Sequence, residues 1–392
     1  MPGDAASTAT PVVIVGSGLA GYAVAREFRK LDKETPLVVL SRDHGGFYSK
    51  PMLSNALAGQ KTAASLLMKS ADKMAAELGA TVLAGVSLQD LDTAARQLTL
   101  AAGERLAYRD LVLALGADPI RLPLAGEAGD TVLSVNDLDD YARFADALEG
   151  ARSVAILGAG LIGCEFANDL LHRGIAPTVL DVADRPLSRL LPAEASAWLR
   201  ARLEAAGVTF RLGVAASRVD RADGGGLTLA LSDGGRLHAD QVLSAVGLRP
   251  RVEVAQAAGI AVGRGITTDR LLATSAAHVY AVGDCAEVVG MNLPYVMPLM
   301  QQSRALAATL CGRPTPVSYP AMPVLVKTPA SPTVVCPPPP GSNGDWQVTS
   351  NVDGCEARFV SADGKLLGFA LLGTATSMKQ TLAAEVPAWV AD

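Results

Sequence analysis

The amino-acid sequence predicts an α/β protein built from parallel sheets covered by helices. Strand-like apolar runs alternate with helical stretches along most of the 392 residues, a pattern typical of parallel sheets with helices on both faces. A glycine-rich turn between such a run and a helix occurs twice, as "VVIVGSGLAGYA" from Val12 and as "VAILGAGLIGCE" from Val154. A chain of this length holds about two to three domains of ordinary size. The sequence therefore predicts two related units.

Each unit reads as strand, glycine turn, helix and second strand. The first runs from the apolar residues 11–15 into the helical "YAVAREFRKL" and on to the apolar residues 36–40. The second runs from residues 154–157 through the helical "CEFANDLLHR" into the strand "APTVLD", which ends at Asp181. The turn glycines are Gly16, Gly18 and Gly21 in the first unit, and Gly158, Gly160 and Gly163 in the second.

The glycine spacing G-x-G-x-x-G has a physical meaning in this context. The first glycine allows the tight turn, the second lets the backbone approach a pyrophosphate, and the third lets the helix pack closely on the strand. The free N–H groups at the helix N-terminus then hold the phosphates. One such motif alone is weak evidence, but a further echo supports duplication: "LVLALGADP" (Leu111–Pro119) and "VLSAVGLRP" (Val242–Pro250). We therefore expect two dinucleotides, one in each of two domains.

An acidic residue about 20 positions after the first glycine usually binds the adenosine ribose. In the second unit Asp181 lies 23 residues after Gly158, and its carboxylate would repel a 2′-phosphate, which favours NADH over NADPH. The first unit has Ser41 and Arg42 before Asp43 at the matching place. The usual acid is thus missing there or displaced by a residue or two, which leaves the first ribose contact open.

A third motif, "TSAAHVYAVGDCAE" (Thr274–Glu287), ends a strand in Gly283-Asp284 and leads into the helical "MPLMQQSRALAATL". Taken alone, Asp284 reads as a turn or helix-capping residue. Together with two dinucleotide units, the motif resembles the FAD-dependent pyridine-nucleotide oxidoreductases. That resemblance implies that Asp284 contacts the ribityl chain of the flavin and that the following helix points at its ring system.

The closer resemblance is to the NADH-dependent rubredoxin reductases. Besides the glycine turns it rests on "YSKPMLS", "SAVGLRPR", "YAVGDCAEV", "YVMPLM" and "VKTPASP", which run in order over nearly the whole chain. It implies two Rossmann-like dinucleotide-binding domains, with the FAD domain interrupted by the NAD domain, and a small C-terminal α+β domain. The expected boundaries are 1–115 and 265–312 for the FAD domain, 116–264 for the NAD domain and 313–392 for the C-terminal domain.

The same resemblance implies the site residues. Lys50 would lie beside flavin N5 and pair with Glu165, which follows the second glycine turn by two residues. A surface lysine and a glutamate favoured by the helix dipole are the plain alternatives for these two residues. Lys327 would lie near the flavin, although it could also be a polar residue at a strand end. The expected FAD contacts are Ser17, Gly18, Leu19 and Ala20 at the pyrophosphate, Arg42 and Asp43 near the adenosine, Leu88 near the adenine, and Val296 and Lys327 near the flavin.

The implied activity is transfer of hydride from NADH to FAD and then of single electrons to rubredoxin, without a redox-active disulfide. A disulfide reductase or a peroxidase-type NADH oxidase needs a cysteine beside the flavin, but no cysteine precedes Cys164, and Asn55 stands where the peroxidase type has one. An NADH-dependent ferredoxin reductase of an oxygenase system differs only in its partner and stays open. A flavoprotein that mainly binds DNA is a further alternative.

Composition argues against that last alternative and indicates the compartment. The net charge is −5, and no long basic run offers the electrostatic footprint of nucleic-acid binding. No apolar stretch reaches the ~20 residues of a membrane span, and the first ten residues lack the parts of a signal peptide. The five cysteines and four histidines are scattered, which fits free thiols, no metal site and a cytoplasmic protein.

Overall fold

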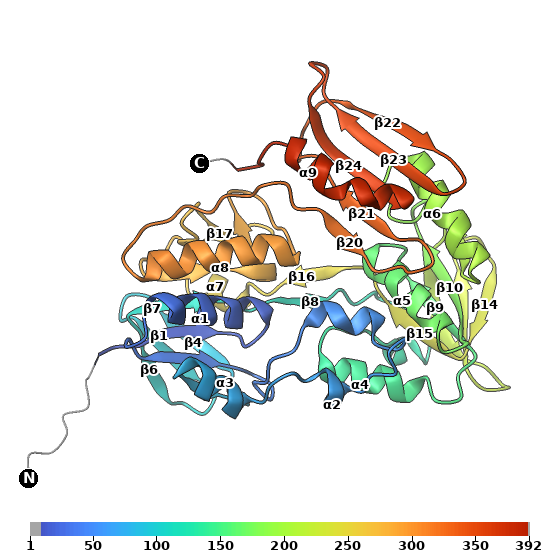
Figure 1. The fold of residues 1–392 in the computed structure, drawn as a ribbon. Helices are drawn as coiled ribbons and strands as arrows, with labels where there is room; N and C mark the ends of the chain where they lie inside the picture. Colours follow the sequence, from blue (N-terminus) through green and yellow to red (C-terminus); the bar gives the residue numbers. More distant parts are fainter. Residues whose placement is uncertain (1–8, 391–392) are drawn as a thin grey trace, which may run out of the picture.

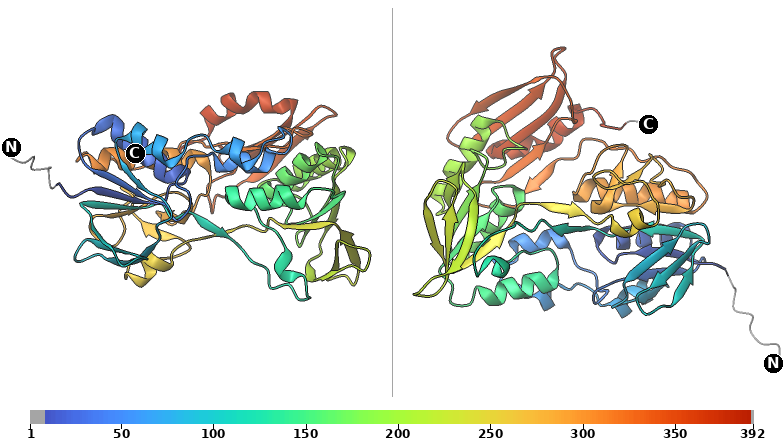
Figure 2. Two further views of the ribbon diagram at one scale, coloured as in Figure 1. Left: turned by 90° about the horizontal axis from the view of Figure 1, so that it is seen from below. Right: turned by 180° about the vertical axis from the view of Figure 1, so that it is seen from behind.

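The computed structural model describes residues 9–390. Residues 1–8 lie outside the described residues. They include the start of the first expected domain and most of the segment that was compared with a signal peptide. Figure 1 shows three parts: a first α/β unit drawn from both early and late segments (blue and orange), a second α/β unit (green to yellow), and a C-terminal unit (red) above them. Figure 2 shows the same three parts from below and from behind.

The first unit is built on a parallel five-stranded sheet in the order β18-β7-β1-β2-β3. Strand β1 is a run of four branched apolar residues that are all buried, as expected for a central parallel strand. The other bounds are β2 Leu37–Leu40, β3 Thr81–Leu83, β7 Asp110–Leu113 and β18 Val279–Ala281, with β1 at Val12–Val15. Because β18 follows the second unit in the chain, the first unit is completed only after the insertion.

Helices and a small antiparallel sheet complete the core of the first unit. Helices α1 (Leu19–Leu31) and α8 (Val296–Leu310) lie side by side, although 277 residues separate their starts. Leu91, Leu98 and Leu100 of the antiparallel sheet join the same buried core. The remaining elements are α3 Ala71–Leu78, β4 Leu88–Asp92, β5 Gln97–Leu100, β6 Arg105–Ala107, β17 Ile266–Thr268, β19 Ala286–Val288, α7 Glu253–Ala257, and the short helices η1 Lys50–Asn55, α2 Ala63–Leu66 and η3 Gly283–Cys285.

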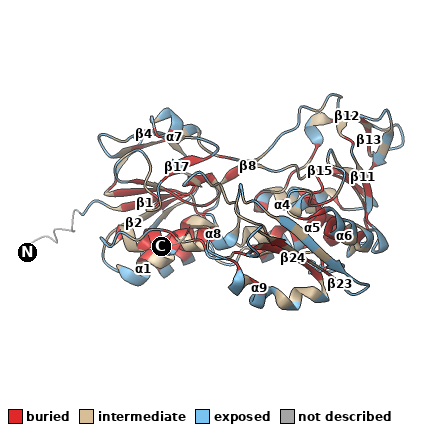
Figure 3. Ribbon diagram, turned by 90° about the horizontal axis from the view of Figure 1, so that it is seen from above, coloured by how far each residue is buried: buried red, intermediate tan, exposed pale blue. Residues whose placement is uncertain are grey.

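The second unit repeats the plan on a parallel sheet in the order β11-β10-β9-β15. Its strands are β9 Ser153–Leu157, β10 Ala176–Asp181, β11 Thr209–Leu212 and β15 Gln241–Ser244. Its helices are α4 Leu138–Ala147, α5 Leu161–Leu171 and α6 Ala193–Ala205, with the short η2 Gly129–Thr131 and an antiparallel sheet of β12 Ala216–Arg221, β13 Leu227–Leu231 and β14 Arg236–Ala239. Figure 3 shows that the central strands of both parallel sheets are buried, while loops and outer helix faces are exposed.

Two antiparallel strands, β8 (Ala117–Pro119) and β16 (Leu248–Pro250), connect the two units. They are the ends of the two echoed sequence segments, so the echo marks where the chain leaves the first unit and returns to it. After β16, Ala255 and Ile260 already belong to the core of the first unit. These core positions favour a return of the chain to the first unit near residue 250, earlier than the expected boundary at 265. The pairing of β8 with β16 places the passage between the two units at that point.

The C-terminal unit is an antiparallel sheet in the order β20-β21-β24-β23-β22, with α9 packed against β24. Helix α6 of the second unit packs against this sheet. Its bounds are β20 Val324–Val326, β21 Thr333–Cys336, β22 Asp345–Ser350, β23 Gly354–Val360, β24 Leu366–Gly373, η4 Thr374–Met378 and α9 Lys379–Glu385. The α/β fold class with a small C-terminal α+β unit is confirmed.

Candidate functional site

The two glycine turns have the same local geometry. Gly16 and Gly158 adopt φ angles of +118° and +108°, which side chains rarely tolerate. A Cβ atom on Gly21 or Gly163 would lie 1.8 Å from the carbonyl oxygen of the first glycine of its own turn. In contrast, a Cβ atom on Gly18 or Gly160 would meet no protein atom within 4 Å. The outer glycines are therefore required by the fold, whereas the middle ones leave open space.

That open space lies at the N-termini of two helices. Helices α1 and α5 begin after Gly18 and Gly160, and neither has a side-chain cap or an acidic residue in its first turn. Their first amide groups thus keep their hydrogen-bonding capacity for a ligand. In each unit, an uncapped helix N-terminus beside an unobstructed glycine is suited to bind a pyrophosphate.

Polar groups stand at the end of the second strand in both units. Asp181 accepts hydrogen bonds from the amides of Ala159 and Ala183, at 2.6 and 2.8 Å. The strand registers make Ser41 the counterpart of Asp181. Ser41 lies 2.6 Å from the Ser17 hydroxyl and donates a 2.6 Å hydrogen bond to Asp43. The acid of the first unit is thus displaced by two residues and connected to the glycine turn through Ser41.

The Asp43 carboxylate is held in its charged form. Burial opposes ionisation, but hydrogen bonds from the Ser41 hydroxyl and the Gly45 amide hold the pKa of Asp43 below its usual value. A charged acceptor of this kind can bind the hydroxyl groups of a ribose.

Two other residues expected near the adenosine lie differently. Arg42 is half exposed and approaches Asp118 of β8 at 3.8 Å. Leu88 is the first residue of β4 and pairs with Leu100. The residue that adjoins the Ser41 turn is Val86, whose amide donates a 2.8 Å hydrogen bond to the Ser41 carbonyl. Val86 thus lies next to the Ser41 turn, two residues before Leu88, and the contact of Leu88 with the adenine stays a prediction.

The Gly283-Asp284 turn lies against the first glycine turn. Gly283 has a φ of +74°, and a Cβ atom there would lie 2.7 Å from the Cβ of Ala20. The Gly283 amide donates a 2.7 Å hydrogen bond to the buried side chain of Gln302 on α8. Helix α8 also has an uncapped N-terminus, where Val296 is partly exposed. Segments that are far apart in the sequence therefore meet at the first glycine turn.

Lys50 lies beside this turn. Its ammonium group is 3.8 Å from the Asp284 carboxylate, and its side chain is 35% exposed. Burial lowers the pKa of Lys50, although the nearby Asp284 carboxylate partly offsets this effect. Asp284 and Lys50 thus form an ion pair at the Gly283-Asp284 turn.

Glu165 has a different partner from the one the sequence predicted. It is completely buried on α5, and its carboxylate accepts hydrogen bonds from the Lys327 ammonium group, from the Lys327 amide at 2.8 Å and from the Ser54 hydroxyl at 2.5 Å. The expected pair of Lys50 with Glu165 is therefore replaced by two pairs, Lys50 with Asp284 and Lys327 with Glu165. The reason is tertiary: Lys327 enters from the C-terminal unit just after β20.

Sequence reasoning missed several residues of this region. Ser54 was part of the quoted "YSKPMLS" motif, and Arg251 ended "SAVGLRPR", so a signal existed for both. Arg251 donates a 2.8 Å hydrogen bond to Asp118, near Lys50. Gln302, by contrast, lies inside a helical stretch and had no signal.

The five cysteines are free. Burial raises the pKa of the Cys164 thiol to about 12 and that of the Cys285 thiol to about 11. Both are therefore protonated at neutral pH and poor nucleophiles. The geometry fits small apolar side chains that fill the core.

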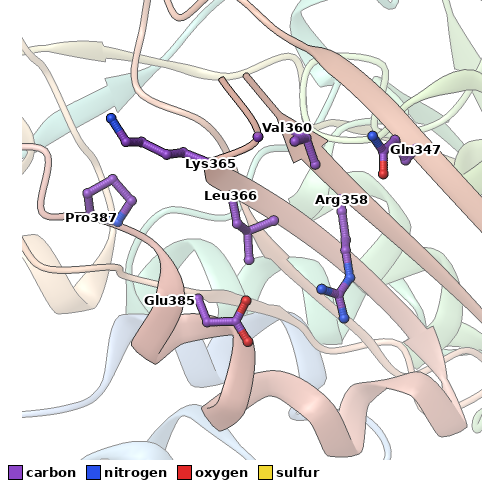
Figure 4. A pocket seen from close by; sticks show the side chains of 8 residues that line it. Gln347, Arg358, Val360, Lys365, Leu366, Glu385 and Pro387 are labelled. Atoms are coloured by element: carbon purple, nitrogen blue, oxygen red, sulfur yellow. The ribbon is translucent and has the colours of Figure 1, made fainter. Parts of the chain in front are cut away.

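A surface depression of about 460 Å³ lies elsewhere, on the C-terminal unit (Figure 4). It is lined by Gln347, Arg358, Val360, Gly364, Lys365, Leu366, Glu385 and Pro387. Arg358 and Lys365 already pair with Glu356 and Asp363, so the depression lacks a free cation. Residues 9–390 also hold no cluster of three metal-ligating side chains. Within the same range, no helix has the length and apolar character needed to cross a membrane.

Comparison with known proteins agrees with this geometry. Residues 10–307 match the family model described as pyridine nucleotide-disulphide oxidoreductase, and residues 316–386 match the rubredoxin binding C-terminal domain. The chain is 51% identical over 378 residues to rubredoxin-NAD(+) reductase of Alcanivorax borkumensis, covering 96% of this chain and 99% of that protein. It is 45% identical to rubredoxin-NAD(+) reductase of Acinetobacter baylyi, covering 96% and 98%.

A solved structure resembles the whole fold. The ferredoxin reductase for the CYP199A2 system of Rhodopseudomonas palustris superposes with a TM-score of 0.87 at 28% identity, covering 96% of this chain and 95% of that one. Two glycine turns, an interrupted first unit and the match over residues 10–307 lead to one conclusion. The chain belongs to the pyridine nucleotide-disulphide oxidoreductase family and carries a rubredoxin-binding C-terminal domain.

Proposed function

We propose that this chain is an NADH-dependent rubredoxin reductase. FAD held by the first unit would supply the redox chemistry, which is acceptance of a hydride from NADH and transfer of single electrons to rubredoxin. The observation that carries the proposal is the C-terminal unit: it matches a rubredoxin-binding domain, and its Lys327 pairs with the buried carboxylate of Glu165 on α5. The unit that matches a rubredoxin-binding domain is thus in direct contact with α5, the helix that follows the second glycine turn.

The chain's residues divide the binding of the two cofactors. In the second unit, the uncapped α5 N-terminus and Gly160 would hold the pyrophosphate of NADH, while Asp181 would bind the ribose hydroxyls and disfavour a 2′-phosphate. In the first unit, the turn from Ser17 to Ala20 would hold the pyrophosphate of FAD and Asp43 its ribose. Asp284 and the N-terminal residues of α8, including Val296, would approach the flavin.

Charge near the flavin is supplied by two lysines. Lys50 would stabilise the negative charge that develops on the flavin ring, because its ammonium group lies beside Asp284, the residue expected to contact the flavin. Lys327 would add a second positive charge, while Glu165 offsets the cost of burying it. Both lysines act by electrostatics and need no proton transfer.

Two alternatives fit less well. A ferredoxin partner is suggested by the solved ferredoxin reductase, but that protein is 28% identical, whereas the full-length relatives named rubredoxin reductases reach 45% and 51%. A thiol relay needs a low-pKa cysteine, and the pKa values of Cys164 and Cys285 are raised by burial. We also place the protein in the cytoplasm, where five free thiols persist.

The proposal is tested by rapid mixing of the FAD-loaded protein with NADH and a purified rubredoxin. We expect bleaching of the flavin absorbance by NADH, followed by bleaching of the iron chromophore of rubredoxin. A parallel trace with a [2Fe–2S] ferredoxin provides the comparison. Faster reduction of the ferredoxin than of the rubredoxin would overturn the choice of acceptor, and NADPH as the faster donor would overturn the choice of NADH.

A further inference from the structure

We propose that Asp169 is a positioning residue: it fastens the Lys50-bearing segment of the FAD unit to helix α5 and so fixes Lys50 relative to Glu165. The proposal rests on the function proposed above. It concerns a residue that neither glycine turn contains and that touches neither expected dinucleotide site directly.

Three buried polar side chains share one face of α5. Glu165, Asn168 and Asp169 are spaced by three and four residues, which places them on the same side of a helix. Each is at most 3% exposed. Such a face is unusual for a helix core, because a buried polar group costs free energy unless it is hydrogen-bonded.

All three side chains are satisfied by partners from outside the second unit. Asp169 uses both carboxylate oxygens, one for the Leu57 amide and one for the Ala58 amide, each at 2.9 Å. Asn168 accepts from the Ala330 amide of the C-terminal unit at 3.0 Å. Glu165 accepts from Ser54 and Lys327. Helix α5 therefore joins all three units by polar contacts along one face.

Asp169 and Glu165 together hold the same short segment at two points. Lys50 begins η1, Ser54 near its end donates to Glu165, and Leu57 and Ala58 follow immediately. Apolar packing alone could slide by a fraction of an ångström, whereas a carboxylate that accepts two consecutive amides permits one register only. The position of Lys50 beside Asp284 is thereby tied to α5, the helix that carries Glu165.

Burial and hydrogen bonding act in opposite directions on the Asp169 carboxyl group. Burial raises its pKa, while the two amide hydrogen bonds oppose that rise. A buried carboxylate that only filled space would be replaceable by an apolar residue with no loss of stability. Its directional hydrogen bonds are the property that an apolar residue lacks.

The test compares Asp169→Asn with a matched control, Asp240→Asn. The asparagine keeps the size of the side chain but turns one acceptor into a donor, which cannot pair with an amide. Asp240 also accepts two consecutive amides, those of Arg152 and Ser153 at 2.8 and 2.9 Å, but both lie within the second unit. Both of these hydrogen bonds fall on the Oδ2 atom of Asp240, so the control removes the same negative charge from a carboxylate that accepts two amides, away from the FAD unit.

Three quantities are measured on the FAD-loaded proteins: the rate of flavin reduction by NADH, the midpoint potential of the bound flavin, and amide hydrogen exchange in the peptide 50–58. For Asp169→Asn we expect roughly 10- to 100-fold slower reduction, the range that a misplacement of about 1 Å can cause. We also expect a lower midpoint potential and faster exchange in that peptide. The dissociation constant of NAD⁺ should stay within about twofold, and Asp240→Asn should match the wild type in all three measurements.

A normal reduction rate and potential in Asp169→Asn would overturn the proposal, as would equal losses in both variants, which would indicate a general loss of stability. The potential and the exchange rate do not depend on the acceptor. A wild-type protein that fails to reduce rubredoxin would thus contradict the proposed function, while these two measurements would still decide the role of Asp169.

Discussion

Hydrogen bonds fix the orientation of the carboxylates at the candidate binding sites of this molecule. Asp181 is held by two amides at the edge of the second glycine turn. Asp43 is held by Ser41 and Gly45 at the first. Glu165 is held by three donors although it is fully buried. A carboxylate with a fixed direction recognises a hydroxyl pair or a cation better than a mobile one, because little side-chain entropy remains to be lost on binding.

Asp181 should set the choice of donor. Replacing it by Ala removes the acceptor for the ribose hydroxyls and the charge that repels a 2′-phosphate, so we expect the Michaelis constant for NADH to rise about tenfold or more, as for the loss of a charged hydrogen bond. The preference for NADH over NADPH should narrow. Steady-state kinetics with both donors measure this, with Asp240→Ala as control. Unchanged constants for both donors would remove Asp181 from the binding site.

Lys50 should govern flavin reduction rather than folding. Lys50→Met keeps the apolar stem and deletes the charge beside Asp284, so we expect slower flavin reduction by NADH and a lower flavin potential, with FAD retained. Stopped-flow absorbance and a potentiometric titration measure these effects. Lys69→Met, which removes an exposed surface pair with Glu77, is the control. A wild-type reduction rate in Lys50→Met would show that the charge has been misassigned.

At the scale of the element, each glycine turn has two glycines that the fold requires and one that faces open space. Its outer glycines are fixed by contacts within 3 Å of the chain's own backbone, while its middle glycine faces open space at the end of an uncapped helix. The duplication of this arrangement in two units explains why two dinucleotides can bind to one chain. The two helices differ later: only α5 continues into a buried polar face.

The glycines should therefore separate folding from binding. Gly18→Ala should leave thermal stability within a few degrees, because its Cβ meets no protein atom within 4 Å, but it should weaken FAD retention by intruding on the pyrophosphate. Gly16→Ala should lose the fold, since its Cβ would lie 2.1 Å from the Ala114 carbonyl oxygen. Thermal unfolding measures the stability of each variant, and the FAD content after gel filtration measures its retention of FAD. Equal FAD content in Gly18→Ala and the wild type would contradict the assigned site.

At the scale of the whole molecule, the three units meet on one helix. Helix α5 contacts the first unit through Ser54 and the C-terminal unit through Lys327, and α6 packs against the sheet of the C-terminal unit. A path for electrons without a relay of thiols is consistent with this arrangement, since the rubredoxin-binding unit already contacts α5 through Lys327.

Removal of every thiol should leave the activity in place. We expect a variant with all five cysteines changed to Ala or Ser to retain NADH-to-rubredoxin turnover within a few-fold, allowing for cavities at the buried Cys164 and Cys285. Turnover and FAD content are measured together. A variant that binds FAD, is reduced by NADH at the normal rate and yet fails to reduce rubredoxin would reinstate a cysteine relay.

The sequence by itself determined the features that are local in the chain. The α/β class, both glycine turns and the strand end at Asp181 follow from glycine spacing and apolar runs, which act over 20 to 30 residues. The order of motifs over the chain also carried the resemblance to rubredoxin reductases. These features need no knowledge of distant contacts, because a turn or a strand is specified by its own residues.

Only the tertiary structure decided the contacts between units. The partner of Glu165 is Lys327 and not Lys50, and Asp169 accepts amides more than a hundred residues away. Neither follows from spacing, because such a pair depends on how three folded units pack on α5. A buried carboxylate must find donors, and which donors reach it is fixed only when the last unit is in place.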